Sequence, residues 1–252
     1  MMRNFSFFRS LVCLGSACLV ACLMTQNTEA LTLQADADSN IEEHQPDDVE
    51  GHLGRMQSRS NTDAGRQNIA YVRFDLGGGT ASNAEFSVIT LNSTNWLDTQ
   101  YFVYGLNDVA GNTPQNWIEM DAGGLSYNSS GAEVPGDGDA LTQDLGSIGT
   151  TGAENLWDLG NLPENLSGGG QTIAFSSAEL DNFLNSRAGG LATLMIVNLE
   201  GSNRDGLFAT KETGDGSVGP TLSGIVPIPE PSSLALALFG LVGFGWAGRR
   251  QR

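Results

Sequence analysis

Short runs in which apolar and polar residues alternate, separated by glycine-rich turns, fill the chain between residues 31 and 226. The clearest run is 69–76, where Val72, Phe74 and Leu76 fall on one face and Tyr71 on the other. A period of two predicts a β-strand. Further strands are expected at 31–35, 84–91, 101–106, 116–121, 125–128, 141–145, 171–175, 191–199, 207–210 and 220–225.

One helix interrupts these strands. Ser176 and Glu179 have the spacing of a capping box, and Leu180, Phe183 and Leu184 form one apolar stripe before a Gly-Gly pair. Many short strands with glycine turns and one short helix predict an all-β fold, a β-sandwich of the jelly-roll type. We expect it to occupy residues 31–226, and the region 36–68 to be mostly a polar loop.

The expected sandwich is strongly acidic. Residues 31–228 contain 27 of the 29 acidic residues and only seven basic ones, a formal net charge of −20. This balance argues against nucleic acid as a partner, because phosphate binding needs clustered Lys and Arg. All three cysteines precede residue 23, so no disulfide framework is expected and the sandwich must be held by its own core.

The N-terminus has the order of a secretory signal peptide. Arg3 and Arg9 flank the start of an apolar run at 11–24, and a polar stretch then leads to Ala30. This order predicts export and cleavage after residue 30. A second interpretation stays open, because residues 19–22 resemble a lipobox in which Cys22 would be lipidated.

At the C-terminus, prolines precede an apolar segment, and a basic tail follows it. The apolar run 234–247 would form a helix of about 20 Å, shorter than the roughly 30 Å hydrocarbon core. The basic tail should stay cytoplasmic, which places the body outside. The motif residues are Pro229, Glu230, Pro231, Arg249, Arg250 and Arg252.

Residues 227–252 resemble the PEP-CTERM sorting signal. The resemblance implies transient anchoring in the inner membrane, processing by an exosortase, release to the cell surface and a tie to extracellular polysaccharide or biofilm matrix. An ordinary single-span anchor is the alternative.

The body resembles the DNRLRE domain family, which is similar to some alginate-binding carbohydrate-binding modules. The matching pieces, in order, are the segments 35–38, 70–76, 103–106 with 117–119, 125–128, 177–190 and 208–212 with 220–222. Tyr127 stands where the family has tryptophan, and the region 129–170 is longer than expected. The resemblance implies a jelly-roll sandwich with a binding or structural role.

Nothing in the sequence predicts catalysis. His44 and His52 both lie in a polar, acidic segment, without a partner pattern for a nucleophilic triad. Three aromatic residues are candidates for stacking on sugar rings: Trp96, Trp117 and Tyr127. Packing in the core is the alternative for each of them.

A structural calcium ion is the cofactor that the sequence permits. Asp36 and Asp38 form one acidic cluster with neighbours at 42, 43 and 47, and Asp137 and Asp139 form another with a neighbour at 144. Carboxylate oxygens suit calcium, although neither cluster has EF-hand spacing. A solvated acidic loop is the alternative in both places.

These observations predict an exported, surface-sorted and non-catalytic protein that associates with extracellular polysaccharide. A structural or adhesive matrix protein without a glycan ligand is the alternative, and a hydrolase would need carboxylates that face each other across a cleft. An exposed aromatic platform would favour the glycan ligand. An acidic glycan would be repelled unless calcium bridges it.

Overall fold

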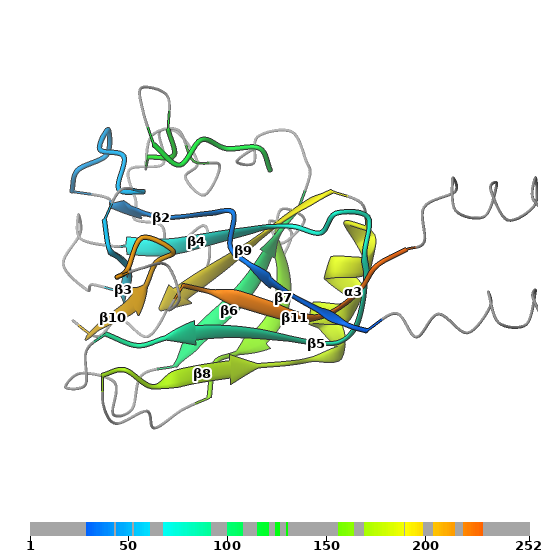
Figure 1. Ribbon diagram of the computed structural model, residues 1–252. Helices are drawn as coiled ribbons and strands as arrows, with labels where there is room; N and C mark the ends of the chain where they lie inside the picture. Colours follow the sequence, from blue (N-terminus) through cyan, green and yellow to red (C-terminus); the bar gives the residue numbers. More distant parts are fainter. Residues whose placement is uncertain are drawn as a thin grey trace, which may run out of the picture. The chain divides into compact units, whose positions relative to one another are not determined.

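The structure is a computed structural model of the chain. It describes residues 29–42, 44–51, 53–60, 68–91, 100–107, 115–120, 124–126, 130, 156–163, 169–188, 190–198, 204–214 and 219–228. Residues 30–226 form one compact unit, which contains every described strand and the described helix (Figure 1).

Two antiparallel sheets make up this unit. The four-stranded sheet contains, in spatial order, β1 (Leu31–Gln34), β11 (Thr221–Val226), β5 (Thr80–Ile89) and β8 (Thr172–Phe175). The seven-stranded sheet has the order β10 (Arg204–Ala209), β3 (Arg55–Ser60), β4 (Asn68–Asp75), β9 (Leu191–Asn198), β6 (Tyr101–Leu106) and β7 (Leu156–Asn161), and β2 (Ala37–Glu42) also pairs with β4. The described helix is α3 (Ala178–Ser186). These elements confirm the predicted all-β class with a short helix.

The main core lies between the two sheets. Phe74 of β4 meets Phe86 of β5 edge to face, with ring centroids 6.1 Å apart, and both rings are fully buried. The predicted stripe of α3 joins the same core through Phe183 and its neighbours, so the helix packs against it. Burial of this apolar surface is the main force that holds the sheets together.

The outer face of the seven-stranded sheet is also buried. Tyr71, predicted on the face opposite Phe74, belongs to a second hydrophobic cluster with Met195 of β9. Trp117 and Leu125 also belong to this cluster, so residues 115–120 and 124–126 cover the sheet, as the green strip beside β2 and β4 shows in Figure 1. This cover fixes the position of the candidate site.

Three strands lie where the sequence predicted loops or no strand: β2, β3 and β7. β2 has the polar sequence ADSNIE, which lacks a repeating apolar pattern. It forms because all six of its residues pair with β4, from Ala37 opposite Arg73 to Glu42 opposite Asn68. Pairing with a neighbouring strand therefore overrides local composition here.

Three local predictions were wrong. The predicted strand 116–121 has turns and bends rather than a strand in its described part, residues 116–120, and the predicted strand 125–128 has no strand at its described residues, 125 and 126. The helix cap is Ser177 rather than Ser176, since the Ser177 hydroxyl accepts from the Leu180 amide at 3.0 Å. The predicted strand at 141–145 lies outside the described residues.

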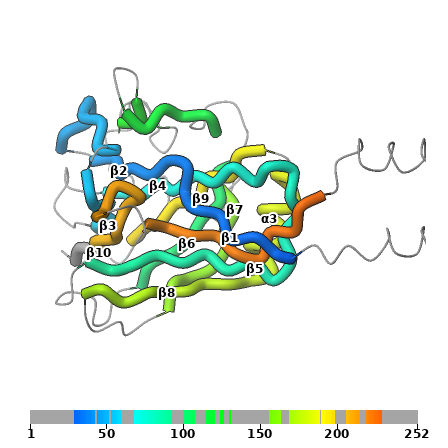
Figure 2. Tube along the Cα trace, viewed as in Figure 1, coloured from blue at the N-terminus to red at the C-terminus, as the bar shows by residue number. Residues whose placement is uncertain are grey.

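The first and last strands of the unit are neighbours. Leu31 pairs with Ile225 and Gln34 with Thr221, and Figure 2 shows the blue β1 beside the orange β11. Beyond the other end of this ladder, the Ala35 amide donates to the Pro220 carbonyl at 3.0 Å. The chain therefore enters and leaves the unit at one end of the ladder.

Candidate functional site

Asp38 is the centre of a polar cluster beside β2. Its side chain is fully buried, because β2 lies between β4 and the turn that follows β10. The Asp38 Oδ2 atom accepts from the Lys211 amide at 2.7 Å. Burying a carboxyl group away from water is costly, so its surroundings must supply hydrogen bonds or positive charge.

Glu119 reaches Asp38 from the segment that covers the outer face of the sheet. The Trp117 indole nitrogen donates to the Thr193 hydroxyl at 3.1 Å, and the Arg73 guanidinium lies 5.0 Å from the centroid of the Trp117 ring. These contacts anchor residues 115–120. Glu119 Oε1 consequently accepts from the Asp38 amide at 3.0 Å.

Lys211 and Glu212 come from the turn that follows β10. This turn is fixed to the chain before β3, since the Thr210 hydroxyl donates to the Leu53 carbonyl at 2.9 Å. The Lys211 ammonium then lies 2.7 Å from Glu119 Oε2 and also contacts the Glu212 carboxylate. The two ion pairs join the turn to the covering segment.

Burial controls the protonation of this cluster. It raises the pKa of Asp38 to about 8, the Lys211 amide opposes that rise, and the Glu212 and Glu119 carboxylates add to it. Burial also raises the pKa of Glu119, against hydrogen bonds from the Asp38 amide and the Lys211 ammonium. Burial alone would lower the pKa of Lys211, but the hydrogen bonds to Glu119 and Glu212 raise it.

Three carboxyl groups therefore meet in one place. Asp38, Glu119 and Glu212 each offer an oxygen, and these atoms lie within 4.8 Å of one another. An arrangement of this kind can hold a cation or share a proton. It joins three parts of the chain that the sequence did not connect by spacing, although all three residues lie in segments quoted for the DNRLRE resemblance.

The predicted calcium residues do not all gather here. Asp36 instead receives the Arg73 guanidinium, with Nη2 at 2.8 Å and Nε at 3.0 Å from Oδ2. Asp137 and Asp139 lie outside the described residues. Of the four predicted ligands, the structure therefore places Asp38 alone in a cluster of carboxylates.

The aromatic candidates have different positions. Trp117 is 4% exposed and packs edge to face on Tyr71, so its ring belongs to the core. Trp96 and Tyr127 lie outside the described residues. Within the described ranges, the exposed large apolar side chains are aliphatic, and two of them, Ile118 and Met120, flank Glu119.

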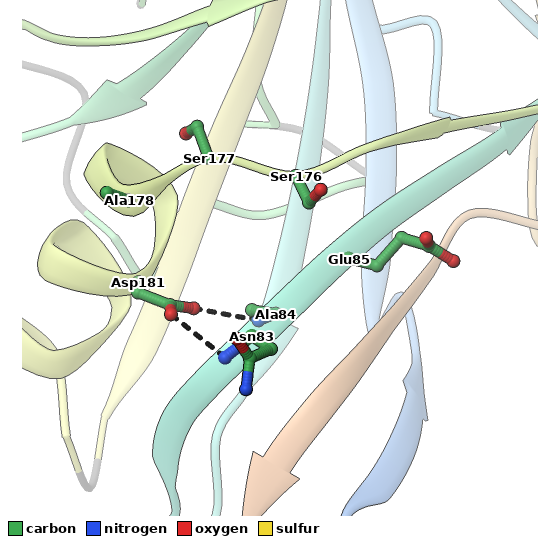
Figure 3. Close-up of a pocket in the computed structure, with 7 residues that line it drawn as sticks. All are labelled: Asn83, Ala84, Glu85, Ser176, Ser177, Ala178 and Asp181. Carbon is green, nitrogen blue, oxygen red and sulfur yellow. Dashed lines mark hydrogen bonds between the residues drawn. The ribbon is translucent and has the colours of Figure 1, made fainter.

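A second polar feature lies between β5 and the start of α3. This pocket has a volume of about 380 Å³ and is lined by Asn83, Ala84, Glu85, Ser176, Ser177, Ala178 and Asp181 (Figure 3). The Asp181 carboxylate points at β5 and accepts from the amides of Asn83 and Ala84 at 2.9 and 2.8 Å. It thereby fixes the helix to the sheet.

Comparison with known proteins identifies the C-terminal segment. The PEP-CTERM protein-sorting motif matches residues 227–251. This match confirms the predicted sorting signal, including Pro229, Glu230 and Pro231, and marks the chain as an exosortase substrate exported to the cell surface. No curated protein matches the chain. In the described part of the chain, no helix is long and apolar enough to cross a membrane.

Proposed function

We propose that residues 30–226 act as a non-catalytic module that the PEP-CTERM motif delivers to the cell surface, where it associates with extracellular polysaccharide. The match of the sorting motif to residues 227–251 carries this proposal, because it assigns the acidic β-rich unit to the cell surface. The DNRLRE resemblance supports a carbohydrate ligand and a jelly-roll arrangement of the sheets.

The acidic cluster and the last residues of β11 occupy different ends of the unit. The sorting motif follows β11, whose last residues pair with the start of β1. The acidic cluster lies beyond the other end of this ladder, since Asp38 follows the Ala35–Pro220 hydrogen bond by three residues. Within the unit, the cluster and the end of β11 therefore lie toward opposite ends of the β1–β11 ladder.

The geometry of the described acids favours a non-catalytic role. Glycosidase carboxylates are about 5–9.5 Å apart and face a substrate. In the cluster of Asp38, Glu119 and Glu212, one oxygen of each residue lies within 4.8 Å of the others, and the fully buried Asp38 does not face a substrate. The His44 side chain is about half exposed, and its ion-pair partner at 3.4 Å is the Glu42 carboxylate rather than a serine or cysteine.

A structural or adhesive role without a glycan ligand is the second candidate. The burial of Trp117 favours it, because this ring presents no face to a sugar. Aromatic stacking on a sugar would then depend on Trp96 and Tyr127. Both are predicted from the sequence and lie outside the described residues.

Affinity electrophoresis distinguishes the two roles. The fragment 30–226, which contains both hydrophobic clusters, would migrate through gels that contain neutral or acidic bacterial exopolysaccharide. We expect retardation of the wild-type fragment, weaker retardation of Trp96→Ala or Tyr127→Ala, and no change for the control Ile118→Ala. Equal migration in every gel would overturn the glycan proposal in favour of the structural role.

A further inference from the structure

We propose that Asp38, Glu119 and Glu212 bind a hard divalent cation, calcium, and that this ion links β2, the covering segment and the turn after β10. The three side chains come from parts of the chain more than 80 residues apart and place their oxygens within 4.8 Å of one another. This proposal is independent of any polysaccharide ligand.

The hydrogen bonds of the cluster leave two carboxylate oxygens available. Asp38 is fully buried, its Oδ2 atom accepts from Lys211, and its Oδ1 atom has no hydrogen-bond partner among the described residues. Glu212 Oε2 is likewise buried and without such a partner in the described ranges. Buried acceptors are rarely left without a partner, so these two atoms are open to a water molecule or to a cation.

The Lys211 ammonium supplies only part of the positive charge. It contacts Glu119 and Glu212, and when all three carboxyl groups are ionised, as they would be around a bound cation, the cluster has a formal charge of −2. A divalent cation would balance this charge. The Lys211 side chain is 24% exposed, so its ammonium can move toward water and open a path to the buried oxygens.

The donor atoms favour calcium over softer metals. The cluster offers carboxylate oxygens and contains neither cysteine nor histidine, the ligands that select zinc or copper. Calcium accepts irregular oxygen coordination and completes its shell with water, whereas magnesium demands near-octahedral geometry. Partial exposure of Glu119 and Glu212 gives water access to the ion.

Calcium titration of the fragment 30–226 tests the site. After removal of metal with EDTA, we expect calcium to raise the melting temperature, with a dissociation constant near the 10⁻⁴–10⁻³ M typical of extracellular modules. Magnesium should act more weakly. Asp38→Asn and Glu212→Gln should each weaken calcium binding at least about tenfold, as measured by isothermal titration calorimetry. Glu85→Gln, which removes an exposed carboxylate on β5, should bind calcium like the wild type.

Lys211→Met separates a metal site from an internal ion pair. If calcium binds as proposed, this variant keeps or gains calcium affinity, because the competing ammonium is gone, and calcium restores its stability. A Lys211→Met fragment that is destabilised and not rescued by calcium would overturn the proposal. So would a wild-type fragment unaffected by about 10 mM calcium, or calcium binding that survives both Asp38→Asn and Glu212→Gln.

Discussion

Gly51 is the residue whose substitution most directly tests how the cluster is positioned. It packs against the covering segment so closely that a Cβ atom on it would lie 2.1 Å from the Glu119 carbonyl oxygen and 2.5 Å from Glu119 Cγ. Ordinary contacts begin near 3.4 Å, so in Gly51→Ala the backbone of one segment must move by roughly 1 Å. Overpacking of this kind costs about 1–3 kcal/mol.

Gly54 provides the matched control three residues later. A Cβ atom on Gly54 would meet no atom within 4 Å. Gly54→Ala should therefore leave stability unchanged or raise it by up to about 1 kcal/mol, since alanine restricts the unfolded chain.

Urea denaturation of the fragment 30–226 measures both effects. We expect a lower transition midpoint with an unchanged slope for Gly51→Ala, relative to the wild type and Gly54→Ala. Because the displaced residue is Glu119, Gly51→Ala should also weaken calcium binding. If the two variants unfold at the same urea concentration, the close contact between Gly51 and Glu119 does not exist in solution, and the described position of the cluster is wrong.

Three further predictions concern the scaffold. Ser177→Ala removes the N-terminal cap of α3 and should lower the free energy of unfolding in urea by about 1 kcal/mol. An unchanged free energy of unfolding would favour Ser176, the cap predicted from the sequence, over Ser177. In Gly105→Ala the new Cβ atom would lie 2.6 Å from the Phe183 ring, so we expect the free energy of unfolding in urea to fall by about 1–3 kcal/mol. Wild-type stability of this variant would contradict the packing of α3 on β6. Burial, aided by Asp158, raises the pKa of Tyr104 to about 12 from 10.0, so the folded state keeps its proton while the unfolded state loses it. Stability should therefore fall by about 2 kcal/mol as pH rises from 10 to 12, and Tyr104→Phe should remove that part of the fall.

Some features of this protein could be predicted from local sequence. The alternation in 69–76 predicted β4, because residues two apart in a strand point to the same face. The stripe of Leu180, Phe183 and Leu184 predicted the buried face of α3. The order of prolines, apolar run and arginines predicted the sorting motif, which acts as a linear signal and needs no partner from elsewhere in the chain.

Other features depended on contacts that no local pattern records. β2 has no apolar repeat and is a strand because β4 pairs with it along its whole length. The sequence offered both a sugar platform and core packing for Trp117, and the outer-face cluster around Tyr71 places this ring in the core. Asp36 and Asp38 are only two residues apart, yet they have different partners. Asp36 forms an ion pair with Arg73, whereas Asp38 is hydrogen-bonded to Glu119 and Lys211.

The sequence by itself determined the β-rich class, the acidic charge and the route to the cell surface, because each follows from composition or from a continuous stretch of chain. Only the tertiary structure decided which carboxylates meet. Asp38, Glu119 and Glu212 are brought together by strand pairing, by the burial of Trp117 and by a turn anchored through Thr210. Such a site is formed by long-range packing, and its residues have no fixed spacing in the sequence.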